Sequence, residues 1–96
     1  MSTEAKLGDL QLKVYDCIRL AGWSGCTTDE IEAALGLTHQ SVSARVNELA
    51  NWRDENRIKK PLIERRGAQR KTRAGRKAFI YVLAGLTEAD KRRGDA

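Results

Sequence analysis

Basic side chains are concentrated between residues 57 and 77 of this 96-residue chain, where ten residues are lysine or arginine and only Glu64 is acidic. Residues 1–56 hold five basic and nine acidic residues, and residues 78–96 hold three of each. The net charge of +5 therefore comes from this one cluster. Mutual repulsion within it disfavours a compact fold, which indicates that a polyanion binds there. A solvated basic loop or a disordered tail is the alternative interpretation.

A second group of side chains, suited to hydrogen bonding, follows Thr38. Val42, Val46 and Leu49 have the spacing of one buried helix face, which predicts a helix over residues 39–51. The opposite strip of this helix carries small or polar side chains and no acidic one: Gln40, Ser43, Ala44 and Asn47. A helix surface of this kind can approach a polyanion, whereas a solvated surface more often carries glutamate and lysine.

The residue types that would indicate an enzyme or a metal site are missing. We find no paired carboxylates, no nucleophile–base pair and no phosphate-cradling glycine loop, so we expect no enzymatic activity. His39 is the sole histidine, and Cys17 and Cys26 form no C-x-x-C motif, so we expect no zinc site and no cofactor. Two cysteines are too few for a disulfide scaffold, and we expect both thiols to be reduced.

Local signals predict three helices in the first half of the chain. Apolar residues at three- and four-residue spacing predict a helix over residues 8–21, ended by Gly22. Thr27 and Glu30 form a capping box at the start of a second helix, which ends at Gly36. The predicted buried stripe of this second helix is Ile31, Ala34 and Leu35. Thr38 caps the third helix.

The second half of the chain carries two strand signals. Residues 62–66 predict a short strand, and the β-branched and aromatic run at 78–83 predicts a stronger one. We expect a basic loop over residues 68–74 to join them into a hairpin, and residues 52–60 to form a polar connection. In the second strand, Phe79 and Tyr81 share one face and Ile80 and Val82 the other.

The segment from Ile31 to Asn47 resembles a helix-turn-helix. That motif has apolar residues at the positions of Ile31 and Leu37, glycine at Gly36 and a β-branched residue at Val42, and all four are present. Residues 10–83 as a whole resemble the winged helix-turn-helix of small phage and actinobacterial DNA-binding proteins. The fold implied is α+β and mainly α, with three helices followed by a β-hairpin wing.

The resemblance implies binding to double-stranded DNA, with residues 38–51 as a recognition helix in the major groove and residues 65–77 as a basic wing on phosphates or the minor groove. The predicted contacts from the recognition helix are Thr38, His39, Gln40, Ser41, Ser43, Ala44 and Asn47. The predicted contacts from the wing are Arg65, Arg66, Arg70, Lys71, Arg73, Arg76 and Lys77.

Within these two sets we expect His39 and Gln40 to read bases, and Arg70 and Arg73 to enter a narrow minor groove. The alternative for each is a solvated side chain without a role. Glu32 and Ala44 depart from the helix-turn-helix pattern, which often has alanine and arginine at those positions. Beside the buried stripe of the third helix, Arg45 is expected to reach DNA or to pair with Glu48 or Glu30.

The predicted function is that of a duplex-DNA-binding transcriptional regulator. A protein-interaction module whose basic wing docks an acidic partner remains an alternative, as does an RNA-binding or nonspecific nucleic-acid-binding protein. We expect no second domain that binds a small-molecule effector, and we expect a monomer in preference to a homodimer.

The length fits one small domain, which we place at residues 8–86, between an N-terminal tail at 1–7 and a C-terminal tail or short helix at 87–96. No apolar run approaches the roughly 20 residues of a membrane-spanning helix. The N-terminus lacks the basic-then-apolar order of a secretory signal. We therefore expect a cytoplasmic protein, of a bacterium or of a phage-infected host, that does not contact a membrane.

Overall fold

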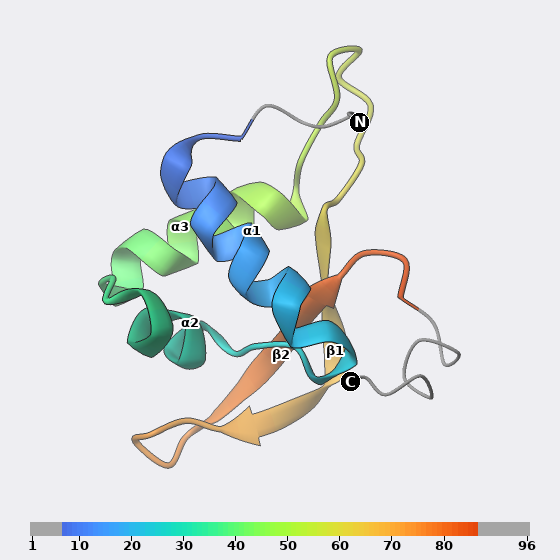
Figure 1. Cartoon of the computed structure of the whole chain (residues 1–96). Helices are drawn as coiled ribbons and strands as arrows, with labels where there is room; N and C mark the ends of the chain where they lie inside the picture. Colours follow the sequence, from blue (N-terminus) through green and yellow to red (C-terminus); the bar gives the residue numbers. More distant parts are fainter. Residues whose placement is uncertain (1–6, 87–96) are drawn as a thin grey trace.

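The computed structural model describes residues 7–86, in which three helices precede an antiparallel hairpin (Figure 1). The elements are α1 (Asp9–Ala21), the short 3-10 helix η1 (Gly22–Ser24), α2 (Thr28–Leu35), α3 (His39–Ala50), β1 (Ile63–Lys71) and β2 (Lys77–Leu83). This is an α+β fold, and the order of its helices and strands is consistent with the predicted winged-helix-like arrangement. The short helix considered at 87–96 lies outside the described residues.

The helix ends follow the predicted capping signals. The Thr27 hydroxyl accepts from the Glu30 backbone N–H at 3.1 Å, and the Glu30 carboxylate accepts from the Thr27 N–H at 3.0 Å, which confirms the capping box. Gly36 takes a left-handed conformation with φ of 67° at the end of α2. Thr38 caps α3 by accepting from the Ser41 N–H at 3.1 Å.

The core lies where the three helices meet the inner end of β1. Its fully buried members come from α1, α2, α3 and β1 and include Val14, Ile18, Ile31, Val42, Leu49 and Ile63. The predicted stripe of α2 is correct for Ile31 and Leu35 but wrong for Ala34, which is exposed. At 3.6 residues per turn, Leu35 and Ala34 lie on opposite sides of Ile31, so Ala34 is at the edge of the buried face of α2. Leu7, which precedes α1, also packs against the core.

The hairpin strands are longer than the sequence indicated. β1 continues to Lys71, so the predicted loop at 68–74 is wrong in its first half, where residues 69–71 pair with 77–79. A register shift between Arg66 and Gln69 takes up the two intervening residues and lets pairing resume. The actual turn covers residues 72–76 and is closed by a 2.7 Å hydrogen bond from the Thr72 N–H to the Arg76 carbonyl.

A third short segment joins the sheet just before α2. Cys26 pairs with Tyr81 of β2 through two backbone hydrogen bonds, at 3.0 and 2.8 Å. The 3-10 helix η1 leads through Gly25 into this sheet contact. This pairing fixes the hairpin against the helices, close to the start of α2.

Residues 52–60, called here the 52–60 loop, leave the C-terminal end of α3 and project from the molecule at the end opposite to the turn of the hairpin (Figure 1).

Within residues 7–86, no helix is long and apolar enough to cross a membrane.

Candidate nucleic-acid interface

The outward strip of α3 lies open to solvent as predicted. Gln40, Ala44 and Asn47 are exposed and Ser43 is half-buried, whereas Val42, Val46 and Leu49 face the core on the opposite side. Two further residues from the predicted set have structural positions at the helix start. The Thr38 hydroxyl serves as the cap, and Ser41 is half-buried and supplies the N–H that this cap binds.

His39 contacts protein groups through both ring nitrogens. Its Nδ1 lies 2.7 Å from the Glu32 carboxylate, and its Nε2 lies 3.3 Å from the Ser43 hydroxyl. The imidazole remains 73% exposed, but base reading would compete with both contacts. Glu32, one of the two departures from the helix-turn-helix pattern, thus sits at the crossing of α2 and α3 and links the two helices through His39.

Arg70 binds the start of α2 instead of extending from the hairpin. Its guanidinium donates to both carboxylate oxygens of Glu30 at 2.9 Å and to the Gly25 carbonyl at 3.0 Å. A bidentate ion pair of this kind is among the stronger side-chain contacts. Arg70 was predicted to enter the minor groove, and the structure places it against the helices.

Arg73 makes the matching contact with Asp29, the residue that precedes Glu30 in α2. Its guanidinium contacts both carboxylate oxygens of Asp29, the shortest distance being 2.8 Å, and its backbone N–H donates to the same group at 3.2 Å. These hydrogen bonds lower the pKa of Asp29 below its usual value. Arg73 is exposed and Asp29 is half-buried, so the second minor-groove candidate is bound to the protein's own carboxylate in this structure.

Two more arginines of the predicted wing stack on aromatic rings. The Arg65 guanidinium carbon lies 4.1 Å from the centre of the Phe79 ring, and that of Arg66 lies 5.1 Å from the centre of the Trp23 ring. Arg66 also donates to the Trp23 carbonyl. Cation–π contacts leave the guanidinium edge available for other acceptors. Phe79 is 38% exposed, so Arg65 covers an aromatic ring on the surface of the hairpin.

The distal end of the hairpin carries the remaining wing cations. Lys71, Arg76 and Lys77 are exposed, and no salt bridge within residues 7–86 includes any of them. Lys71 pairs directly with Lys77 across the two strands. Like charges in directly opposed positions destabilise a sheet, and a bound anion would relieve that repulsion.

The α3 strip and this lysine pair belong to one surface. Tyr81 lines a hollow of about 230 Å³ between α3 and β2, together with Thr28, Ser43, Val46, Asn47 and Ala50. Strand register places cross-strand partners on the same face, and alternation brings every second residue of β2 back to it. Tyr81, Phe79 and Lys77 therefore share one face of β2, and Tyr81 lies beside α3 on that face. Ile80 and Val82 occupy the other face and are buried.

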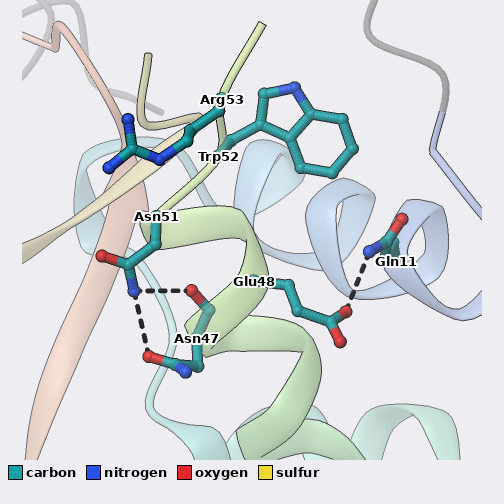
Figure 2. A pocket seen from close by; sticks show the side chains of 6 residues that line it. All are labelled: Gln11, Asn47, Glu48, Asn51, Trp52 and Arg53. Carbon is teal, nitrogen blue, oxygen red and sulfur yellow. Dashed lines mark hydrogen bonds between the residues drawn. The ribbon is translucent and has the colours of Figure 1, made fainter. Parts of the chain in front are cut away.

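The C-terminal end of α3 adds polar groups that the sequence interpretation omitted. A hollow of about 470 Å³ lies here, and Figure 2 shows the side chains that line it: Gln11, Asn47, Glu48, Asn51, Trp52 and Arg53. The Asn51 side chain donates to the Asn47 side chain at 3.0 Å. Glu48 accepts from Gln11 at 2.8 Å and pairs with Arg45, and these contacts lower the pKa of Glu48. Of the two carboxylate partners considered for Arg45, Glu48 is the one observed.

Within the described residues, no cluster of three or more histidine, cysteine or acidic side chains is placed to hold a metal ion. Comparison with protein-family models, with curated proteins and with solved structures gave no match to this chain.

Proposed function

We propose that this chain is a winged helix-turn-helix protein that binds duplex DNA as a transcriptional regulator, with α3 in the major groove and the β1–β2 hairpin beside it on the phosphates. The observation that carries the proposal is the continuity between the acid-free strip of α3 and the opposed Lys71–Lys77 pair. The helix supplies groups that can read base edges, and the uncompensated lysines supply the phosphate contact.

The roles of the residues differ from those that the sequence suggested. Gln40 is the best base-reading candidate, because its amide can pair with adenine and it is exposed on the first turn of α3. Ser43 and Asn47 line the hollow where a sugar–phosphate backbone would pass. Lys71, Arg76 and Lys77 hold phosphates, whereas Arg70 and Arg73 fix the hairpin to α2.

The test is a salt series of duplex binding by fluorescence anisotropy. Wild-type protein that neutralises about six phosphates gives a slope of log K against log salt near −5. The variant Lys71→Gln/Lys77→Gln should flatten this slope by about 2, because two phosphate contacts are lost. Lys13→Gln/Arg19→Gln, which removes two positive charges from the exposed side of α1, should leave the slope close to the wild-type value.

Absence of wild-type binding at low salt would contradict the proposal and direct attention to an acidic protein partner. Equal or greater affinity for structured RNA would assign the surface to RNA instead.

A further inference from the structure

The salt bridges separate the cationic side chains of the described chain into two classes. Arg19, Arg45, Lys60, Arg70 and Arg73 have carboxylate partners. Those without one in residues 7–86, apart from Lys13 on α1, form two groups. The first lies on the hairpin and consists of Arg65, Arg66, Lys71, Arg76 and Lys77. The second is Arg53, Arg57 and Lys59 in the 52–60 loop, all of them exposed.

The 52–60 loop is held in a defined shape by its own hydrogen bonds. Arg53 and Lys59 form an antiparallel bridge, and the Lys60 N–H donates to the Trp52 carbonyl at 2.8 Å. The Asp54 carboxylate accepts from the Ile58 N–H at 2.9 Å and the Asn56 N–H at 2.8 Å. The carboxylate of Asp54 is therefore turned inward, and it also lies 3.6 Å from the Lys60 ammonium.

Arg57 occupies the tip in an unusual backbone conformation. Its φ of 64° is the one positive φ of a non-glycine residue in the described chain. Such conformations are sparsely populated for residues other than glycine, asparagine and aspartate. Its carbonyl accepts from the Arg53 guanidinium at 2.9 Å, which leaves most of the donors of Arg53 unused. The loop thus presents ordered cations at its tip.

The end of α3 extends this basic surface towards the helix strip. In Figure 2, the amides of Asn47 and Asn51 and the guanidinium of Arg53 lie on one side of the helix end, whereas Trp52, Glu48 and Gln11 lie on the other. Amide and guanidinium donors are typical ligands of phosphate oxygens. Asn47 belongs to the predicted base-contacting strip, so the two surfaces join at this residue.

We propose that the 52–60 loop and the end of α3 form a second contact with the phosphate backbone of duplex DNA, opposite the contact made by the hairpin. This inference rests on the proposed function. A major groove is bounded by one sugar–phosphate backbone on each side, so a helix within it has a backbone near each of its flanks. α3 lies between the hairpin turn and the 52–60 loop, which project from opposite ends of the molecule (Figure 1).

The loop variant Arg57→Gly/Lys59→Gln tests this contact with little risk to folding. Glycine adopts the positive φ at position 57 more easily than arginine, so the loop keeps its shape while losing two positive charges. We expect its salt slope to be shallower than that of wild type by about 2, and its affinity to fall about tenfold on every duplex sequence. Lys13→Gln/Arg19→Gln is the matched control.

A variant that removes a negative charge from the same loop provides a second test. Glu55 is exposed in the same loop, and Glu55→Gln removes a negative charge that would repel phosphates. We expect this variant to bind every duplex several-fold more tightly, a gain that damage to folding cannot produce. Hydroxyl-radical footprinting should show that the loop variant loses protection on one flank of the site only.

The outcomes separate this proposal from the one on which it rests. If wild type and the loop variant bind with the same slope while Lys71→Gln/Lys77→Gln is weakened, the duplex-binding function stands and the loop contact is refuted. If wild type binds no duplex at low salt, both proposals are refuted together.

Discussion

Gln40 lies exposed on the first turn of α3, and its side chain makes no hydrogen bond to another group in the described chain. Its amide is thus free to pair with a base. We expect Gln40→Ala to cost about 1–3 kcal/mol on a preferred duplex and little on random sequence. Anisotropy titrations on both duplexes measure the difference. His39→Ala is the control, because the ring of His39 already contacts Glu32 and Ser43. If Gln40→Ala loses the same affinity on both duplexes, base reading by Gln40 is contradicted.

Among the glycines that the structure describes, Gly25 is the one where an added side chain would do most damage. Its φ is +65°, and an added Cβ would lie 2.4 Å from the Tyr81 carbonyl oxygen and 2.6 Å from Ile80 Cγ2. We expect Gly25→Ala to lower the free energy of unfolding by about 3 kcal/mol or more, since backbone strain and overpacking add. The measurement is the urea midpoint followed by circular dichroism.

The variant Gly36→Ala is the matched comparison for the free energy of unfolding that Gly25→Ala loses. Its φ is +67° but an added Cβ would meet nothing within 4 Å, so only the conformational cost of about 1–2 kcal/mol remains. Similar losses for the two variants would show that Gly25 has no packing role against β2.

Contacts between residues that are close in the sequence could be predicted, whereas contacts between residues that are far apart in the sequence could not. The capping box joins Thr27 to Glu30, only three positions away, so its chemistry is visible in the sequence. Arg70 pairs with Glu30 across forty positions and Arg73 with Asp29 across forty-four. Nothing local to the two arginines indicates those partners, so both were assigned to DNA.

At the level of elements, Asp29 at the start of α2 controls how much charge the hairpin turn presents. The neutral variant Asp29→Asn releases Arg73 and removes a negative charge close to the proposed interface. We expect duplex affinity to rise several-fold and the salt slope to steepen by about 1. Asp16→Asn, which disrupts the equivalent exposed pair with Arg19 on α1, is the control. A fall in affinity for Asp29→Asn would show instead that the pair positions the hairpin.

The shape of the 52–60 loop should depend on the charge of Asp54. Hydrogen bonds from the Ile58 and Asn56 N–H groups lower the pKa of Asp54 below its usual value of 3.8. A depressed pKa means that the stabilisation is complete above the unfolded-state pKa and is lost as the pH falls through the folded value. We expect the amide signals of Ile58 and Asn56 to titrate together in NMR, with a midpoint below 3.8. A midpoint at or above that value would contradict this assignment.

Element types were easier to predict than element lengths. Helical spacing and caps placed α1, α2 and α3 within a residue or two of their observed ends. The hairpin was predicted too short, because its basic, glycine-flanked middle resembles a loop and only cross-strand pairing makes residues 69–71 a strand. The order of the 52–60 loop was equally hidden, since Asp54 and the backbone bridge that shape it carry no distinct sequence signal.

For the molecule as a whole, Cys26 is where the helices and the sheet are joined. It is buried, its backbone pairs with Tyr81, and its thiol donates to the Cys17 carbonyl at 3.5 Å. Burial is the main cause that raises the pKa of the Cys26 thiol to about 12, so the folded protein holds almost no reactive thiolate at pH 8. Alkylation of Cys26 therefore requires an opening that separates β2 from the helices.

We expect that opening to be global unfolding. In the variant Cys17→Ser, Cys26 is the single thiol, and its alkylation rate at pH 8 relative to that of the unfolded chain gives an opening free energy. Because the hairpin is fixed to α2 by Arg70 and Arg73 as well as through Cys26, this value should equal the free energy of unfolding from urea denaturation. An opening free energy lower by more than about 1 kcal/mol would show that the hairpin detaches on its own, a motion that would let it adjust to the DNA backbone after α3 has bound.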